Sequence, residues 1–286
     1  MKNRKLYEII LKSFIYFSLT ITLLLLTFII GWIFYKGIPF LTWDLLLTSP
    51  IHSKHHIGIL PNIINTIYII LLTLIISLPI GLGTAIYLNE YSTNKKFSNI
   101  IEFTTETLSV IPSIIYGLVG MLFFVRLFNF KVSLLSGSLT MSIIILPTII
   151  RTTQEALKCV PNNYREGALA LGSGKWHMIK TIVLPSAIEG IITSCILSVG
   201  RIVGESAALL FTAGMGTVIA SDVFSALKTG GGTLSVALYM YANERAEFDI
   251  AYAIGTVLLI IVLIINIGTK LTKNIIKNKQ GANNNG

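Results

Sequence analysis

Residues 60–88 decide the fold, and they read LPNIINTIYIILLTLIISLPIGLGTAIYL without a single charged side chain. The hydrocarbon core of a bilayer is about 30 Å thick, so a helix needs roughly 20 mainly apolar residues to cross it. Five other stretches satisfy the same criterion. The six expected spans are residues 14–35, 60–88, 107–128, 135–150, 187–211 and 250–269. We therefore predict an all-α polytopic membrane protein with six transmembrane helices.

The composition of the whole chain agrees with this class. Of the 286 residues, 53% are apolar and 12% are charged, whereas soluble domains carry roughly 25% charged residues. These values exclude a soluble globule, and the high hydrophobicity excludes an intrinsically disordered chain. The net charge of +9 does not indicate a nucleic-acid partner, because membrane proteins gather Lys and Arg on their cytoplasmic segments.

The placement of Lys and Arg sets the expected orientation. With the N-terminus in the cytoplasm, fifteen of the 22 basic residues fall on cytoplasmic segments and six on external ones. Both termini are therefore expected in the cytoplasm. The expected organisation is a cytoplasmic segment at 1–13, a six-helix transmembrane domain at 14–270 and a basic, disordered tail at 271–286. No small-residue cleavage site follows the first span, which is expected to remain as an anchor.

The longest expected cytoplasmic connection is residues 152–185, between the fourth and fifth spans. Within it, Asn162 is expected to cap a short helix and Gly172 to end that helix. Residues 176–183 are expected to form a second short helix, which Pro185 ends. A helix pair of this kind on a membrane face suits docking to a soluble partner.

The same connection contains Gly172-Ser173-Gly174-Lys175, which looks like part of a phosphate-binding loop. That motif also needs Gly three residues before Gly172 and Ser or Thr directly after Lys175. Leu169 and Trp176 occupy those positions. The chain therefore has no nucleotide motif of its own, and any use of ATP requires a separate ATPase.

Ionisable residues inside a span are functional candidates, because each costs about 2.5–3.5 kcal/mol on insertion scales. Arg201 and Glu205 lie in the fifth expected span, four residues apart, which places both on one face of a helix. Two hypotheses remain open. Arg201 is an anion ligand that Glu205 holds in place, since a guanidinium matches phosphate or carboxylate oxygens. Alternatively, the two residues form a buried salt bridge that fixes helix packing.

Arg151 and Glu155 repeat the spacing of four at the inner end of the fourth span. Here snorkelling to the interface is a sufficient explanation. Glu106 is expected to open the third span, where a helix N-terminus favours a carboxylate. Glu189, at the start of the fifth span, has the same interpretation.

The third expected span is interrupted by residues 112–117, which read PSIIYG. A proline removes one backbone hydrogen bond, and broken backbone at membrane depth is tolerated where it faces protein or a watery cavity. By itself the break indicates either a kink or part of a polar path. No metal site is expected in the first external loop, because His52, His55 and His56 have neither a carboxylate nor a Cys beside them.

The spacing Glu166-Gly167-Ala168-x3-Gly172-x9-Ile182-x-Leu184-Pro185 resembles the EAA loop of ABC-importer permeases, with Gly167 in place of the usual Ala. The resemblance implies that this loop forms a coupling helix seated in a groove of an ATP-binding subunit. The residues that it assigns to ATPase coupling are Arg165, Glu166, Gly167, Ala168, Gly172 and Pro185. The alternative is an ordinary amphipathic hairpin at the membrane surface.

Four longer blocks, residues 81–91, 112–117, 146–153 and 204–213, resemble the PstA family of phosphate-importer permeases. The last block reads GESAALLFTA and is similar to that family's GETAPLLFTA. The resemblance implies a MetI-like ABC-importer permease fold in the plasma (inner) membrane of a prokaryote. It also implies that Arg151 and Arg201 lie on a phosphate pathway. With Glu205, Ser113 and Tyr116, these are the candidate residues for translocation.

The resemblance further implies a complex. Its members are a PstC-type permease subunit, two PstB-type ATPase subunits and a PstS-type phosphate-binding protein outside the membrane. The chain is then not an enzyme and binds no cofactor, because ATP and Mg²⁺ are used by the ATPase subunits. Rival hypotheses change the cargo to sulfate, molybdate or tungstate, or replace the importer with an ion-coupled secondary transporter. A secondary transporter would have no use for a coupling loop.

Overall fold

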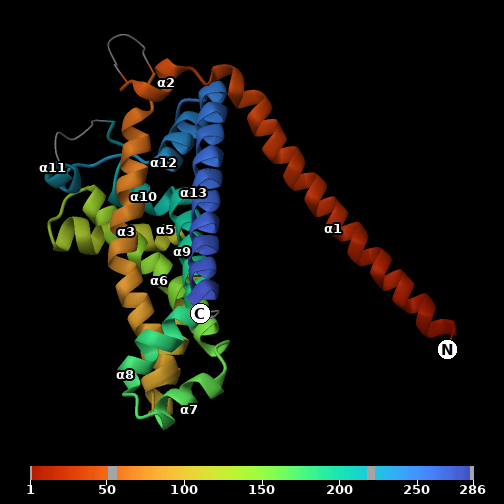
Figure 1. The fold of residues 1–286 in the computed structure, drawn as a ribbon. Coiled ribbons are helices and arrows are strands. Elements are labelled where there is room, and N and C mark those ends of the chain that lie inside the picture. The colour runs from red at the N-terminus through yellow and green to blue at the C-terminus, as the bar shows by residue number, and fades with distance from the viewer. Residues whose placement is uncertain (1, 51–56, 218–222, 284–286) are drawn as a thin grey trace.

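The computed structural model describes residues 2–50, 57–217 and 223–283, and these residues fold into helices without a β-strand. Five of the helical stretches are long and apolar enough to cross a membrane. They contain α1 (Lys2–Gly37), α3 (Leu60–Ile86), α6 (Leu134–Lys158), α9 (Leu184–Gly204) and α13 (Phe248–Asn283). A bent pair, α4 (Lys95–Val110) and α5 (Ser113–Gly120), supplies the sixth span if it counts as one. The predicted all-α membrane class is confirmed (Figure 1).

Short elements connect or extend these helices. On the N-terminal side they are η1 (Ile38–Phe40), α2 (Trp43–Leu47), and the π-helical turns η3 (Tyr87–Tyr91) and η4 (Met121–Leu127). Between α6 and α9 they are α7 (Asn162–Ala170), α8 (Lys175–Met178) and η5 (Ile179–Val183). Between α9 and α13 they are α10 (Ala207–Thr212), α11 (Val223–Lys228), α12 (Leu234–Tyr239) and η6 (Met240–Glu244).

Two expected spans are broken rather than continuous. Between α4 and α5 the chain turns by 101°, because Ile111 and Pro112 are extended and Pro112 has no N–H to continue the helix. This break agrees with the expected interruption at residues 112–117, whereas the expectation of one helix over residues 187–211 is wrong. There α9 ends at Gly204, Glu205 is extended, and α10 begins at Ala207.

The connection around α7 is shorter than expected, because both flanking helices extend into it. Helix α6 continues past Arg151 to Lys158 and is therefore longer than the fourth expected span, residues 135–150. On the other side, residues 175–204 form one continuous helical stretch. Pro185 is the second residue of α9 and therefore does not end a helix, since proline is tolerated in a first helical turn.

The tail also differs from the expectation of disorder. Helix α13 continues to Asn283, so residues 271–283 are helical, and residues 284–286 lie outside the described part of the chain. In Figure 1 both termini lie toward the side of the molecule that carries α7 and α8, away from α2. This arrangement agrees with termini on one membrane face, whereas their cytoplasmic position remains a prediction.

Helix α6 lies at the centre of the bundle, between α3 and α9. Its Met141, Ile145 and Ile149 are completely buried. Small residues bring the neighbouring helices close to it, as a Cβ atom at Gly81 would lie 2.6 Å from Ile149 Cγ2. Close contact between helices through small residues is usual in membranes, where lipid gives no hydrophobic drive for association.

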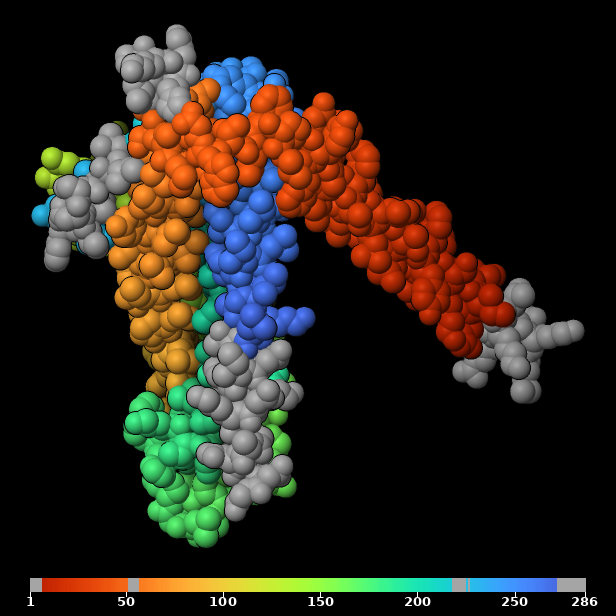
Figure 2. All heavy atoms as spheres, turned by 45° about the horizontal axis from the view of Figure 1, so that its top comes forward, coloured from red at the N-terminus to blue at the C-terminus, as the bar shows by residue number. Residues whose placement is uncertain are grey.

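Helix α1 extends away from the bundle, and the large apolar side chains along it are exposed (Figures 1 and 2). It approaches α13 near its own C-terminal end. There the Thr256 hydroxyl donates to the Ile33 carbonyl oxygen at 3.2 Å, and Gly37 lies directly against Thr256 and the backbone of Tyr252. The absence of a side chain at Gly37 is what permits this contact.

A substitution at Gly37 tests the contact between α1 and α13. Gly37→Leu is expected to cost about 1–3 kcal/mol, because the new Cβ would collide with the Tyr252 backbone. The measurement is the thermal unfolding midpoint of the detergent-purified protein. Gly31→Leu is the matched control, because a Cβ atom there would meet no other atom within 4 Å. Equal midpoints for the two variants would contradict the proposed contact.

Candidate functional site

Helix α7 projects from the end of the bundle (Figure 1). Ala168 is its buried residue and joins a small core with Leu157 and Val160. Glu166 and Gly167 are exposed. The expectation that Gly172 ends this helix is confirmed, since Gly172 adopts a φ of +80° that favours glycine. The expected cap at Asn162 is wrong, because Asn162 is the first helical residue and follows Pro161.

Several large apolar side chains of this projection are exposed, as is the carboxylate of Glu166. Leu171 is 90% exposed and Trp176 is 60% exposed, and Tyr164 and Leu169 are exposed beside them. Exposed apolar groups gathered in one place mark an interaction surface. None of these four was among the residues expected to mediate coupling, although large apolar residues in a polar connection were a usable signal.

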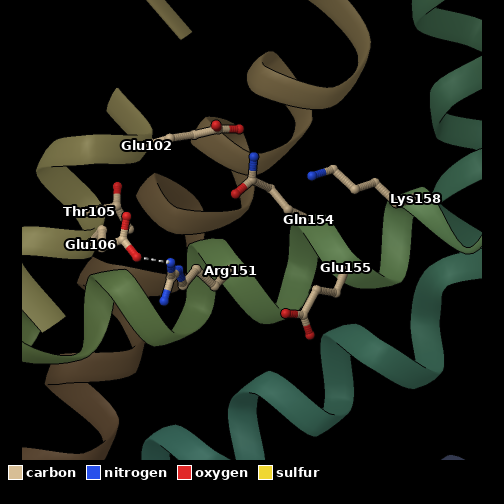
Figure 3. A pocket seen from close by; sticks show the side chains of 7 residues that line it. All are labelled: Glu102, Thr105, Glu106, Arg151, Gln154, Glu155 and Lys158. Carbon is tan, nitrogen blue, oxygen red and sulfur yellow. Dashed lines mark hydrogen bonds and ion pairs between the residues drawn. The ribbon is translucent and has the colours of Figure 1, made fainter. Parts of the chain in front are cut away.

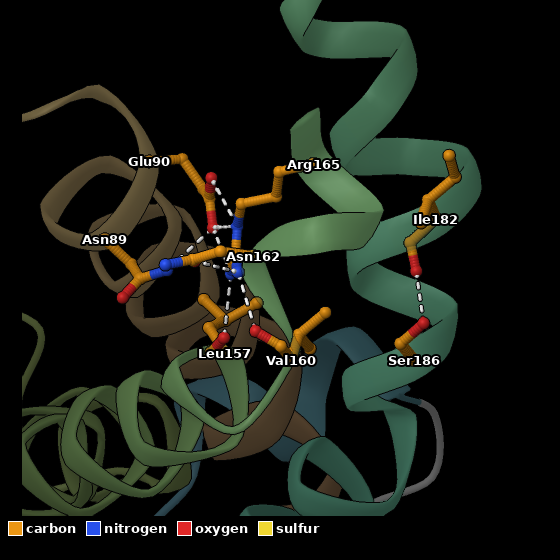
Figure 4. A network of polar contacts seen from close by, with 8 residues as sticks. All are labelled: Asn89, Glu90, Leu157, Val160, Asn162, Arg165, Ile182 and Ser186. Atoms are coloured by element: carbon orange, nitrogen blue, oxygen red, sulfur yellow. Dashed lines mark hydrogen bonds and ion pairs between the residues drawn. The ribbon is translucent and has the colours of Figure 1, made fainter. Parts of the chain in front are cut away.

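Arg165 reaches toward Glu90 and the end of α6 (Figure 4). Its Nη2 donates to Glu90 Oε1 at 2.8 Å and to the Leu157 carbonyl oxygen at 2.8 Å. Its Nη1 donates to the Val160 carbonyl oxygen at 2.7 Å and to Asn162 Oδ1 at 3.2 Å, and Nε completes the contact with Glu90. All five guanidinium donors are thus used within the chain.

Glu90, the partner of Arg165, was not singled out by sequence reasoning. Its side chain is 5% exposed, and that of Arg165 is 15% exposed. Glu90 also accepts a hydrogen bond from Asn89 Nδ2 at 2.7 Å. The pair joins the π-helical turn η3 to the start of α7, although the two residues are 75 positions apart in sequence.

Arg151 lies on α6 and faces α4 (Figure 3). Its Nη2 is 3.2 Å from Glu106 Oε1, and both side chains are more than half exposed. Exposed ion pairs contribute little, about 0–1 kcal/mol. The expected position of Glu106 at a helix N-terminus is wrong, because α4 starts at Lys95. In Figure 3 the marked contact of Arg151 runs to Glu106 and not to Glu155.

The Arg151–Glu106 pair borders a polar cavity of about 400 Å³. The cavity is lined by Glu102, Thr105, Glu106, Arg151, Gln154, Glu155 and Lys158. Arg201, Glu205, Ser113 and Tyr116 do not line it. The structure therefore separates Arg151 from the other residues expected on a translocation path.

Arg201 and Glu205 do not share a helix face, which corrects the expectation of a pair four residues apart. Glu205 follows the end of α9, and its Oε1 accepts a hydrogen bond from the Ala208 N–H at 3.1 Å at the start of α10. Arg201 is half-buried in the last turn of α9. Within the described ranges, no carboxylate forms an ion pair with Arg201.

Tyr116 and Ser113 lie on α5, close to the break that contains Glu205. A Cβ atom at Gly117 would lie 2.8 Å from Ala208 Cα, so α5 and α10 are in close contact. The Tyr116 hydroxyl donates to the Leu108 carbonyl oxygen at 2.7 Å. Ser113 is half-buried as the first residue of α5.

No cluster of His, Cys, Asp and Glu suited to a metal ion occurs among the described residues. His52, His55 and His56, considered above for metal binding, lie outside the described residues. Of the two arginines expected on a translocation path, Arg151 pairs with Glu106, and Arg201 pairs with no carboxylate of the described residues.

The comparisons with known proteins agree on one family of transport-system membrane components. Residues 77–279 match the model described as binding-protein-dependent transport system inner membrane component. The phosphate transport system permease protein PstA of Haemophilus influenzae is 33% identical over 273 residues, which cover 94% of each chain. The probable ABC transporter permease protein YqgI of Bacillus subtilis is 35% identical over 215 residues, or 75% of this chain and 73% of that one.

Solved structures support the fold. A chain of the bacterial alginate ABC transporter in complex with an alginate pentasaccharide-bound periplasmic protein has a TM-score of 0.63 at 16% identity, and 95% of each chain is covered. A chain of the MetNI methionine ABC transporter, in an inward-facing conformation, has a TM-score of 0.60 at 17% identity and covers 77% of this chain. The expected MetI-like permease fold is confirmed.

Two substitutions at Glu205 separate a structural role from an electrostatic one. Glu205→Gln keeps an oxygen acceptor for the Ala208 N–H, so its unfolding midpoint is expected to match the wild type. Glu205→Ala loses this cap, which costs about 1 kcal/mol, or about 2–4 °C in Tm. Thermal unfolding in detergent measures both. A midpoint for Glu205→Gln as low as that of Glu205→Ala would mean that the charge itself is needed.

Proposed function

This chain belongs to the family of binding-protein-dependent transport system inner membrane components, and on that premise we propose that it is the permease subunit of an ATP-driven phosphate importer. Its apolar helices and its family make it a multi-pass protein of the inner membrane. The observation that carries the phosphate assignment is the 33% identity to a PstA permease over 94% of both chains.

The exposed surface around α7 supports coupling to a separate ATPase. It combines the carboxylate of Glu166 with the apolar side chains of Tyr164, Leu169, Leu171 and Trp176. A short helix with a mixed apolar and charged face fits a groove on a soluble partner. We infer that ATP binding and hydrolysis occur on that partner, with its own Mg²⁺, and that this chain is non-catalytic and carries no cofactor.

Arg201 is the strongest candidate for contact with the transported anion. It is half-buried at membrane depth, where an arginine is costly and usually functional. No carboxylate of the described part of the chain neutralises it, so its guanidinium is available for bidentate contact with a tetrahedral oxyanion. Tyr116 and Ser113 belong to α5, which packs against α10 just after the break at Glu205, and they complete the proposed binding region.

Arg151 is proposed as a second anion contact, nearer the end of the bundle that carries α7. Its weak, exposed pairing with Glu106 can be exchanged for phosphate at little cost. Arg201 does not line the cavity beside Arg151. We therefore propose that a second chain supplies the surface that connects the two arginines into one pathway. A second permease of the PstC type is the proposed partner, with a PstS-type binding protein that delivers phosphate from outside.

The function is tested by uptake of radiolabelled phosphate and sulfate in cells that contain only this importer. Wild-type cells are expected to take up phosphate, and Arg201→Ala is expected to reduce this uptake at least about 100-fold, because loss of a buried charge contact costs about 3 kcal/mol or more. Complex recovery and basal ATPase activity are expected to stay unchanged. Arg126→Ala, which removes an exposed arginine, is the control.

Uptake of sulfate, molybdate or tungstate in place of phosphate would overturn the cargo assignment. Full phosphate uptake by Arg201→Ala would remove Arg201 from the pathway while leaving the cargo assignment intact.

The coupling surface is tested by reversing the charge of Glu166. Glu166→Lys is expected to reduce recovery of the ATPase subunits with the permease, because the substitution places a positive charge in the middle of the proposed docking surface. Co-purification in detergent measures the effect. Glu244→Lys makes the same change at an exposed residue of η6, far from α7, and should leave recovery unchanged. Equal recovery of both variants would contradict the assignment.

A further inference from the structure

Helix α3 crosses the bundle without interruption and is clamped by polar side chains at both ends. We propose that α3 acts as a connecting rod, which links the position of α7 to the position of the glycine-rich loop 230–233 at the opposite end. This inference rests on the proposed function and adds to it a route by which ATPase movement reaches the outer side of the permease.

The inner clamp is the Glu90–Arg165 ion pair. Both side chains are largely buried, and a buried pair is strongly destabilised when one partner is removed. Arg165 is itself the fourth residue of α7, so α7 cannot shift without moving Glu90 or breaking this contact. Glu90 belongs to η3, which continues α3 directly.

The same guanidinium holds the end of α6. Arg165 donates to the carbonyl oxygens of Leu157 and Val160 at 2.8 and 2.7 Å. A displacement of α7 is therefore passed to α3 and α6 together. Arg151 lies six residues before Leu157 on the same continuous helix, roughly 9 Å along its axis.

The outer clamp is a row of buried polar side chains on the first turns of α3. Asn62 and Asn65 donate through Nδ2 to the Gly232 carbonyl oxygen at 2.9 and 3.3 Å. The Thr66 hydroxyl accepts a hydrogen bond from the Leu234 N–H at 2.9 Å. Asn65 also lies directly against the Cα atom of Gly231, where a side chain would have no room. The loop backbone is thus fixed to α3.

From this loop the contacts lead to the break in the fifth span. Ser235 is the second residue of α12, and its hydroxyl donates to the Glu205 carbonyl oxygen at 2.8 Å. Glu205 in turn caps α10 and lies four residues after Arg201. A shift of α3 along its axis would therefore change the surroundings of Arg201.

The length and packing of α3 suit this role. From Thr66 to Glu90 the helix rises roughly 36 Å, which is about the thickness of the hydrocarbon core. The helix continues across Pro79, and buried Thr73 and Ser77 lie on its middle turns against the central helix α6. A continuous helix held at both ends transmits an axial displacement, which a chain of separate loops would absorb.

The test uses the complete complex in proteoliposomes and measures how far cargo-loaded binding protein stimulates ATPase activity. Glu90→Gln weakens the inner clamp and Thr66→Val the outer one. Each is expected to reduce stimulation at least about fivefold, as loss of a typical coupling free energy does. Unstimulated ATPase activity and subunit recovery should remain. Thr84→Ala, which removes a hydroxyl that donates within α3, is the control and should behave as wild type.

The double variant Glu90→Gln with Thr66→Val should lose no more stimulation than the more severe single variant, because both substitutions interrupt one path. The proposed role of α3 would be overturned if the two losses of ATPase stimulation multiplied in the double variant. It would also be overturned if Thr66→Val kept wild-type stimulation. A second measurement needs no substitution. Amide hydrogen exchange of residues 230–234 in the wild-type complex should change when ATP binds, and unchanged exchange would also overturn the proposal.

These outcomes are distinct from failure of the proposed function. A complex that imports sulfate would overturn the phosphate assignment, yet its ATPase stimulation would still report on the rod. Conversely, phosphate uptake with normal stimulation of ATPase activity in both Glu90→Gln and Thr66→Val would leave the proposed function intact. The same result would overturn the proposed role of α3.

Discussion

A bilayer offers no water to backbone groups that a helix leaves unpaired, and this constraint organises the whole bundle. The chain breaks its helices at Pro112, at Glu205 and along the glycines before α12, and at each place a side chain binds the exposed backbone. Tyr116 donates to the Leu108 carbonyl oxygen, Glu205 accepts from the Ala208 N–H, and Thr66 accepts from the Leu234 N–H. Irregular backbone is therefore maintained by side-chain hydrogen bonds. Those at Pro112 and Glu205 are local, and the one from Leu234 to Thr66 joins distant segments.

This constraint changes how polar residues inside the membrane are interpreted. A polar residue that binds broken backbone has a structural task, so its presence is weak evidence for transport. Glu205 and Tyr116 have such tasks, whereas Arg201 pairs with no carboxylate of the described residues. Because an uncompensated guanidinium is costly at membrane depth, Arg201 by itself is the main candidate for substrate contact, and a charged pair with Glu205 is not.

Much of the fold could be predicted from the sequence, because long apolar stretches are a local signal. Pro112 indicated the break in the third span, because proline has no N–H to continue a helix. The break at Glu205 could not be predicted, since neither Gly204 nor Glu205 is a residue that must end a helix. The ion pairs could not be predicted either, because their partners are far apart in sequence. Glu106 and Arg151 are 45 positions apart, and Glu90 and Arg165 are 75 positions apart. For the site, local pattern located the α7 connection and its end at Gly172. It did not show that Arg165 faces inward and that apolar residues cover the outside.

The inward position of Arg165 explains why a charged pair is found at a junction that apolar packing could also hold. A hydrophobic contact of similar volume is often as stable as a buried ion pair, but it permits sliding. The Arg165 guanidinium instead fixes one geometry, because its planar fork binds Glu90 and two main-chain carbonyl groups of fixed direction. A helix that must carry a displacement from a partner needs such a fixed register more than it needs extra stability. The surface left outside, rich in apolar groups, is then free to bind that partner.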